Sequence, residues 1–299
     1  MSEVLQVNEI YAKLGLKAPW KLLDFAQKND DTHFTGYKGF AVNEEFFVGH
    51  FPVHPIVPGV LHVESMRQLC CCFLPGDARA KRIKMLEKVK FRRPILPGDR
   101  MIVEAEVVEF SDDQWIIKAV CKTASGVCSE ATMTIISAPE VTGGIKSLPV
   151  LDSECARTAD INMDTDQVMG LMPHRFPFLL IDYIAKVEST RIIAVKNISG
   201  NEQFIDGGYT TVPDALMCEI AAQSGCASVL SRPENAGKLG FFMAIDKAVF
   251  HRQVVPGEQI LIDINLPESK SRFGKGAGLI RVGEEVVAEV ALMFAIVEA

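Results

Sequence analysis

The chain has 299 residues, of which 48% are hydrophobic and 23% are charged, and its formal net charge at pH 7 is −7. This length suits one large domain or two domains of ordinary size. The hydrophobic runs are too short for a membrane span, and the negative charge disfavours a nucleic-acid partner. The N-terminal residues do not resemble an export signal, so we expect a cytoplasmic protein.

The chain contains two copies of one unit. The N-terminal segments Pro19–Asp24 and Asn43–Phe46 recur as Pro177–Asp182 and Asn201–Phe204, and a later stretch, Phe91–Asp99, recurs as Phe250–Glu258. Around residues 141–165 the apolar pattern is diluted, which is typical of a linker, by several acidic residues and by Pro139, Gly143, Gly144, Ser147 and Pro149. The repeat predicts a tandem duplication with domains at 1–140 and 166–299.

Each copy has the same expected order of elements: an N-terminal segment, one long helix and several strands. The helices start at Pro58 and Pro213 and end near Pro75 and Pro233, and they are apolar almost all round, which indicates burial. The following strands alternate apolar and polar residues, as in 103–107 and 260–265, which indicates half-buried antiparallel strands. We therefore expect an α+β fold in which a sheet wraps each buried helix.

Two carboxyl groups lie on these apolar helices. Glu64 is followed by Gln68, and Glu219 by Gln223, each one helical turn later. A buried carboxylate is costly unless it is paired or protonated, so these residues are candidates for chemistry. Considered alone, such a pair is more often a structural polar contact along a helix face than a catalytic group.

A histidine precedes the first helix. His50 lies in the segment Gly49–Val60, where three prolines stiffen the chain, and the backbone amides of Gly59 and Val60 lie at the start of the helix. A fixed histidine there is a candidate base, and amides at a helix N-terminus stabilise a developing oxyanion. We expect the remaining candidates to be structural or surface residues: His54, His62, His174 and His251.

The segment Gly49–Val60, together with Glu64 and Gln68, closely resembles the signature of the 3-hydroxyacyl-acyl-carrier-protein dehydratases. In the second copy, Leu171–Asp182 resembles the N-terminal motif of the same family. The resemblance implies two tandem hot-dog domains that form an internal pseudo-dimer. It also implies elimination of water from (3R)-hydroxyacyl thioesters on acyl carrier protein, giving trans-2-enoyl thioesters in fatty-acid or related biosynthesis, with neither a cofactor nor a metal.

Each copy departs from the family pattern in a different place. The second copy has Gly207–Val212 where the first has the histidine loop, with Gly208 opposite His50. Because the family pairs the histidine of one hot-dog domain with the acidic residue of the other, the resemblance implies one catalytic site made of His50 and Glu219. Gln223 would orient the Glu219 carboxyl, and the degenerate second site would place Glu64 beside Gly208 without a base. For chemistry at neutral pH, we expect burial to raise the pKa of Glu219 and to keep His50 neutral.

A basic stripe follows the first helix, with Glu87 as its one acidic residue; it consists of Arg79, Lys81, Arg82, Lys84, Lys88, Lys90, Arg92 and Arg93. It is either a solvated surface or a docking site for an acidic carrier protein. Two alternative functions remain open at this point, a hot-dog acyl thioesterase and a non-catalytic module that binds acyl chains or the carrier protein. The sequence also leaves association into homo-oligomers open.

The cysteines form no pair or metal-binding pattern. Eight are present, including the adjacent Cys70, Cys71 and Cys72, and none occurs in a Cys-x-x-Cys pair or beside a histidine at metal-ligand spacing. We therefore expect buried, reduced thiols and no metal site.

Overall fold

The computed structural model describes residues 3–139, 141, 144–145, 162–235, 237–267 and 273–298. No helix in these ranges is long and apolar enough to cross a membrane. Most of the predicted linker 141–165 lies outside the described residues, so the exact domain boundaries stay a prediction.

The first copy supplies three helices and seven strands among the described residues. They are, in chain order, β1 (Glu3–Gln6), α1 (Val7–Leu14), β2 (Phe25–Lys28), β3 (His33–Gly39), α2 (Phe46–Gly49), α3 (Gly59–Phe73), β4 (Lys81–Phe91), β5 (Arg100–Ser111), β6 (Gln114–Thr123) and β7 (Gly126–Ser137).

The second copy repeats this order from α1 onward. Its elements are α4 (Thr165–Leu171), β8 (Tyr183–Val187), β9 (Arg191–Asn197), α5 (Gln203–Asp206), α6 (Asp214–Leu230), the short 3-10 helix η1 (Pro233–Asn235), β10 (Lys238–Phe250), β11 (Gln259–Asn265), β12 (Phe273–Val282) and β13 (Glu285–Glu298). The repeat that the sequence predicts is therefore confirmed in the structure.

The strands form one antiparallel sheet that runs through both copies. Its 13 strands have the order β1-β2-β3-β5-β6-β7-β4-β10-β13-β12-β11-β9-β8. The copies join at the β4–β10 pair, where Val89 is opposite Ile245 and Leu86 is opposite Ala248. From this central pair outward, the strand order in one copy matches that in the other, so the molecule is an internal pseudo-dimer of two hot-dog units.

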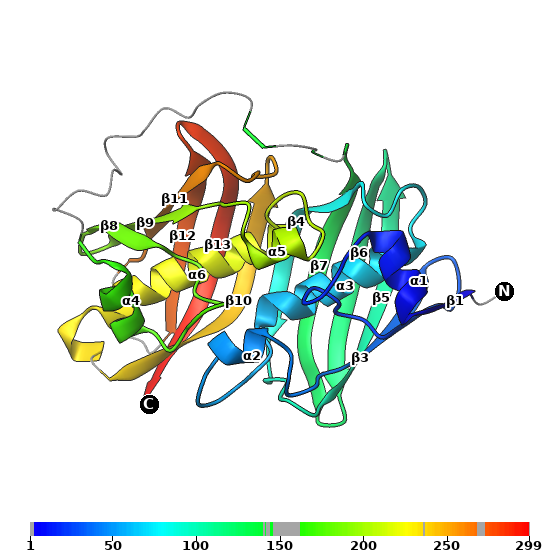
Figure 1. Cartoon of the computed structure of the whole chain (residues 1–299), viewed down its shortest axis with the longest axis horizontal. Helices are drawn as coiled ribbons and strands as arrows, with labels where there is room; N and C mark the ends of the chain where they lie inside the picture. Colours follow the sequence, from blue (N-terminus) through cyan, green and yellow to red (C-terminus); the bar gives the residue numbers. More distant parts are fainter. Residues whose placement is uncertain are drawn as a thin grey trace.

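The long helices α3 and α6 lie across the same face of this sheet (Figure 1). Every residue of α3 from Val60 to Phe73 is buried, and α6 is buried along nearly its whole length. Helices that are apolar all round are stable only when other elements cover every face, and the sheet and the neighbouring helix do so here. The predicted helices are confirmed, and each begins directly after its proline.

The predicted strand alternation is also confirmed. In β11 the side chains of Ile260, Ile262 and Ile264 are fully buried, whereas Asp263 between them is only partly buried. The sequence analysis did not identify the two short strands that precede each long helix, namely β2 and β3 in the first copy and β8 and β9 in the second. All the described cysteines are buried and unpaired, as predicted, and Cys155 lies outside the described residues.

Candidate active site

His50 lies directly after the short helix α2, and hydrogen bonds fix both its backbone and its ring. Its amide donates to the Phe46 carbonyl at 2.8 Å, and its carbonyl accepts from the Ile56 amide at 2.9 Å. The ring Nδ1 lies 2.9 Å from the Ile56 carbonyl oxygen. Because a carbonyl only accepts, Nδ1 carries the proton and Nε2 keeps its lone pair, which is the form that a base requires.

Glu219 projects from α6 of the other copy, and Gln223 fixes its carboxyl group. The Gln223 side-chain amide donates to Glu219 Oε1 at 2.9 Å and to the Phe178 carbonyl at 2.9 Å. Its own oxygen accepts from the Leu180 amide at 2.9 Å. With all of these bonds made, Gln223 has one orientation and holds the carboxyl in place, which is the orienting role expected of it.

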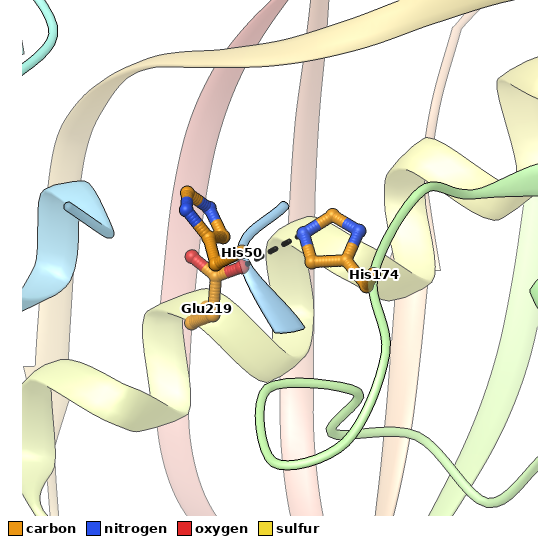
Figure 2. Close-up of side chains that lie close together, drawn as sticks. All are labelled: His50, His174 and Glu219. Carbon is orange, nitrogen blue, oxygen red and sulfur yellow. Dashed lines mark ion pairs between the residues drawn. The ribbon is translucent and has the colours of Figure 1, made fainter. Parts of the chain in front are cut away.

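His174 completes the cluster, and the sequence analysis missed it. Its Nε2 lies 3.5 Å from Glu219 Oε1, and its ring centre lies 5.5 Å from that of His50. One ligand atom from each of His50, His174 and Glu219 lies within 4.8 Å of the other two, so the same side chains could also bind a metal ion. Figure 2 shows the His50 ring above the Glu219 carboxyl group and the His174 ring to its right, with the ion pair to His174 dashed. The signal that could have found His174 is its place in the motif Leu171–Asp182, which the first copy lacks.

The loops that carry His50 and His174 meet at Gly49. The Arg175 amide donates to the Gly49 carbonyl at 3.0 Å, and a Cβ atom at Gly49 would lie 2.1 Å from the Arg175 carbonyl oxygen. Glycine is therefore required here, because any side chain would push the two loops apart. The matching crossing on the other side of the molecule joins the Lys17 amide to the Gly207 carbonyl at 2.7 Å.

Burial and neighbouring charges decide the protonation of these groups. Burial is the main cause that lowers the pKa of His50 to about 4, with a smaller effect from His174, so the ring is neutral at pH 7 as expected. The expectation of a raised pKa for Glu219 is wrong. Burial does raise it, but the hydrogen bond and charge of His174, the charge of His50 and the hydrogen bond from Gln223 together lower the pKa below its ordinary value.

A cavity of about 420 Å³ opens beside the three side chains. Its walls are mainly apolar and include Phe91, Phe242, Phe294, Ala222, Cys226 and Met243. Gly59 lies in the wall at the first turn of α3, and a Cβ atom there would lie 2.8 Å from the Phe91 ring. Val60, which we expected to act with Gly59, is buried and does not line the cavity.

The other histidines differ in their surroundings. His62 lines the same cavity, but its Nδ1 lies 3.1 Å from Ser129 Oγ, and burial lowers its pKa to about 3. His54 and His251 are exposed, and His251 lies 2.9 Å from Glu289. These three residues fit the structural or surface roles that we expected, whereas His174 does not.

The side chains around Glu64, in the second cross-copy site, differ from those that we expected from the sequence. The side chain that reaches Glu64 belongs to Tyr209, the residue after Gly208, and its hydroxyl donates to the Glu64 carboxylate. Arg67 also donates to both oxygens of that carboxylate, at 2.7 to 3.0 Å. Gln68 repeats the role of Gln223, donating to Glu64 at 3.1 Å and to the Trp20 carbonyl at 3.1 Å. Glu64 is therefore enclosed in a polar cluster rather than placed beside an empty glycine position.

Alignment of the two helices explains this difference. When Glu64 is aligned with Glu219, the counterpart of Arg67 is Ala222, which lines the cavity beside Glu219. The Arg67 side chain is 10% exposed and that of Glu64 is 1% exposed, so they form a buried ion pair. An arginine thus fills in one copy the space that an alanine leaves open in the other.

The basic stripe does not form one continuous surface. Arg92 and Arg93 lie at the cavity beside His50, whereas Arg79, Lys81 and Arg82 line a different cavity near Tyr209. Lys81 is 2% exposed, which excludes it from a docking surface. In the later part of the stripe, Lys88, Lys90, Arg92 and Arg93 are exposed, and the last two line the cavity beside His50.

Family models match both copies. Residues 26–130 match a family model described as ApeI dehydratase, and residues 172–291 match one described as a FabA-like domain. Solved structures match across the whole chain. The dehydratase domain from the CurJ module of curacin polyketide synthase superposes with a TM-score of 0.64 at 13% identity, covering 92% of this chain and 96% of that domain. A tesB protein of Mycobacterium avium subs paratuberculosis has a TM-score of 0.58 at 12% identity, covering 98% and 100%. At these identities the likeness establishes the fold alone, which dehydratases share with proteins of the tesB type.

Sequence similarity to curated proteins is more specific. The 3-hydroxyacyl-[acyl-carrier-protein] dehydratase FabZ of Pelotomaculum thermopropionicum is 45% identical over 138 residues, which are 45% of this chain and 99% of that protein. A segment about as long as one copy of this chain therefore corresponds to the whole of that relative. This chain belongs to the FabZ family of 3-hydroxyacyl-[acyl-carrier-protein] dehydratases and is a tandem, double hot-dog member of that family.

Proposed function

We propose that the chain eliminates water from (3R)-hydroxyacyl thioesters on acyl carrier protein and releases trans-2-enoyl thioesters at a single site. The observation that carries this proposal is the placement of His50 from one copy and Glu219 from the other beside one mainly apolar cavity. Elimination needs a base for the C2 proton and an acid for the C3 hydroxyl, and this pair supplies both.

His50 is the base. Its ring is neutral because its pKa is lowered to about 4, and the Ile56 carbonyl holds the Nδ1 proton. The Nε2 lone pair takes the proton from C2 of the substrate, and the electrons of that C–H bond form the C2–C3 double bond. The amide of Gly59, at the N-terminus of α3, binds the thioester carbonyl, where negative charge develops as the proton leaves.

Glu219 delivers a proton to the departing hydroxyl. The C3–O bond breaks with its electron pair on oxygen, and the proton from the carboxyl group converts the hydroxyl into water. Because the pKa of Glu219 is lowered, the carboxyl group must hold a proton before elimination begins, and His174 Nε2, 3.5 Å from Oε1, positions it. After each turnover, the proton that His50 took from C2 returns to Glu219 and restores the enzyme. His174 is therefore a positioning residue for Glu219.

The substrate arrives on a small acidic carrier protein, and the exposed basic residues beside the cavity fit such a partner. Lys90 and Arg92 already contact Glu130, at 3.4 and 2.7 Å, which leaves Lys88 and Arg93 as the better-placed cations. Reversal of Lys88, Lys90 and Arg93 to glutamate is expected to raise KM for carrier-linked substrate and to leave KM for a small thioester substrate unchanged. An unchanged KM for the carrier-linked substrate would exclude this surface.

The central experiment compares formation of enoyl thioester by the wild type and by the Glu219→Gln and Glu64→Gln variants. Loss of an acid of this kind is expected to lower kcat about 10²- to 10⁴-fold in Glu219→Gln. Glu64→Gln is the matched control, because it makes the same change at the aligned position of the other copy. Its Arg67 loses a charged partner, so its folded state is checked by circular dichroism at the assay temperature.

Three outcomes contradict the proposal. If Glu64→Gln is the variant that loses turnover, the acid lies in the same copy as His50 and the cross-copy pairing is wrong. If the wild type forms no enoyl thioester, the dehydratase activity is wrong. If the wild type instead releases free thiol, the protein is a thioesterase.

For His174, replacement by glutamine is expected to lower kcat and to shift the acidic limb of the kcat–pH profile, with KM unchanged. A profile identical to that of the wild type would assign His174 a purely structural role.

A further inference from the structure

The second cross-copy site contains a cavity of its own, of about 120 Å³. Several of its lining residues are the counterparts of residues that line the larger cavity, as expected from the pseudo-dimer. Leu16 takes the place of His174, and Asp214 takes the place of Gly59 at the start of the long helix. This cavity is therefore what the second active site of the pseudo-dimer has become.

The changes between the two cavities follow one chemical pattern. Ala222, Gly240 and Phe241 line the larger cavity, and their counterparts in the smaller one are Arg67, Lys81 and Arg82. The strand pairing supports this alignment, because Arg82 of β4 is opposite Ile136 of β7 and Phe241 of β10 is opposite the matching residue of β13. Small or apolar side chains have thus been replaced three times by cations.

The smaller cavity consequently has a strong excess of positive charge. Arg79 joins Arg67, Lys81 and Arg82 in its wall, against one lining carboxyl group, that of Asp214. Burial is the main cause that raises the pKa of Asp214 to about 7, so this group offsets only part of the charge at neutral pH. Glu64 pairs with Arg67 from behind the wall, and the charges of Arg82 and Arg67 act on Asp214, so the lining holds four cations against one carboxyl group.

Arg82 adds an observation that points to a ligand. Its Nη2 donates to the His251 carbonyl at 3.4 Å, but its buried Nη1 has no hydrogen-bond partner among the described residues. Arg82 as a whole is only partly buried, but an N–H group that is itself shielded from solvent ordinarily has a hydrogen-bond partner, because an unsatisfied charged donor costs more than a neutral one. Lys81, in contrast, already donates to the Asp77 carbonyl at 2.9 Å.

From these features we propose that the second cavity binds a small oxyanion of the phosphate class, either free phosphate or a small phosphomonoester, rather than an acyl chain. Arginine side chains suit this ligand because their planar donors match two oxygens of one phosphate group. The volume of the cavity fits an anion of a few atoms and is too small for a thioester with its acyl chain. This site does not depend on the dehydratase activity proposed above.

Calorimetric titration of the full chain tests the proposal, with inorganic phosphate and methyl phosphate as probes and chloride at matched ionic strength as the reference. We expect saturable binding of a phosphate probe, and the preferred probe identifies a free or an esterified phosphate as the ligand class. Arg82→Gln and Arg79→Gln are each expected to raise Kd about tenfold or more, as loss of a charge-assisted hydrogen bond does. Arg79 is exposed, so its variant keeps the test valid if Arg82→Gln fails to fold.

Two control variants locate the binding site. Arg100→Gln removes the same charge from an exposed position on β5 and is expected to leave Kd within about twofold of the wild type. Glu219→Gln should bind phosphate as the wild type does, even though it is expected to lack turnover. Binding no stronger than that of chloride would overturn the proposal. A loss of affinity in Arg93→Gln with no loss in Arg82→Gln would also overturn it, because the anion would then occupy the cavity beside His50.

Discussion

Replacement of Gly49 by alanine should disrupt catalysis through geometry alone, because Gly49 touches no substrate in the proposed mechanism. The new Cβ atom would lie 2.1 Å from the Arg175 carbonyl oxygen and 2.9 Å from the Phe178 amide nitrogen. Ordinary contact begins near 3.4 Å, so the loops that carry His50 and His174 must separate by about 1.3 Å (3.4 − 2.1). Misplacement of catalytic groups by about 1 Å costs on the order of 10²-fold in rate.

The assay measures kcat/KM for enoyl-thioester formation together with the free energy of unfolding. We expect a loss of about 10²-fold in kcat/KM for Gly49→Ala and a loss of about 1–3 kcal/mol in stability, as is usual for overpacking. Measurements well below the unfolding temperature keep the two effects separate.

The pseudo-dimer provides a matched control at Gly207, the counterpart of Gly49. A Cβ atom there would lie 2.2 Å from the Trp20 side chain, so Gly207→Ala should also lose stability. It should keep kcat/KM within a few-fold of the wild type, because that side of the molecule lacks the catalytic pair. Gly200→Ala meets nothing within 4 Å and should change neither quantity. Equal activity in the Gly49→Ala and Gly207→Ala variants would refute the reasoning.

Two further predictions concern buried ionisable side chains. Burial lowers the pKa of His62 to about 3, so the unfolded chain binds its proton first, and stability should fall as the pH drops from about 6.5. The loss reaches about 2 kcal/mol at pH 5. Denaturant titrations at pH 6.5 and 5 give the free energy of unfolding, which should fall less between these pH values in His62→Gln than in the wild type. An equal fall in both proteins would count against this assignment. Replacement of Arg67 by methionine leaves Glu64 buried without its cation and should cost about 3–5 kcal/mol of stability. The double variant Arg67→Met, Glu64→Gln should recover most of this loss in urea unfolding, and no recovery would show that the pair is not the cause.

The sequence predicted those features of the fold that depend on local pattern or on repetition. The two long helices were identifiable because their apolar residues continue all round and a proline precedes each start. The strands β2 and β3 were not, because Phe25–Lys28 and His33–Gly39 are short and their positions depend on pairing, of β2 with β3 and of β3 with β5. A short strand of mixed composition is fixed by its neighbours rather than by its own residues.

The residues of the candidate site also fall into those that the sequence could predict and those that it could not. His50 and Glu219 could be paired from the sequence because the family resemblance supplies the cross-copy rule. His174 and Tyr209 could not be placed, because each lies in a loop whose position depends on contact between the two copies, at the crossings of Gly49 and Gly207. The pKa of Glu219 was predicted in the wrong direction for the same reason. Its burial could be foreseen from the sequence, but the hydrogen bond from His174 could not.

Because both copies that meet at the β4–β10 pair belong to one chain, the activity should respond to dilution differently from that of a dimer of separate chains. In a dimer of separate chains, a site built from both partners disappears when the protein concentration falls below the dissociation constant. Here the partners are covalently joined, so each copy sees the other at an effective concentration that dilution cannot change. Turnover per chain should accordingly stay constant down to any concentration at which it can be measured.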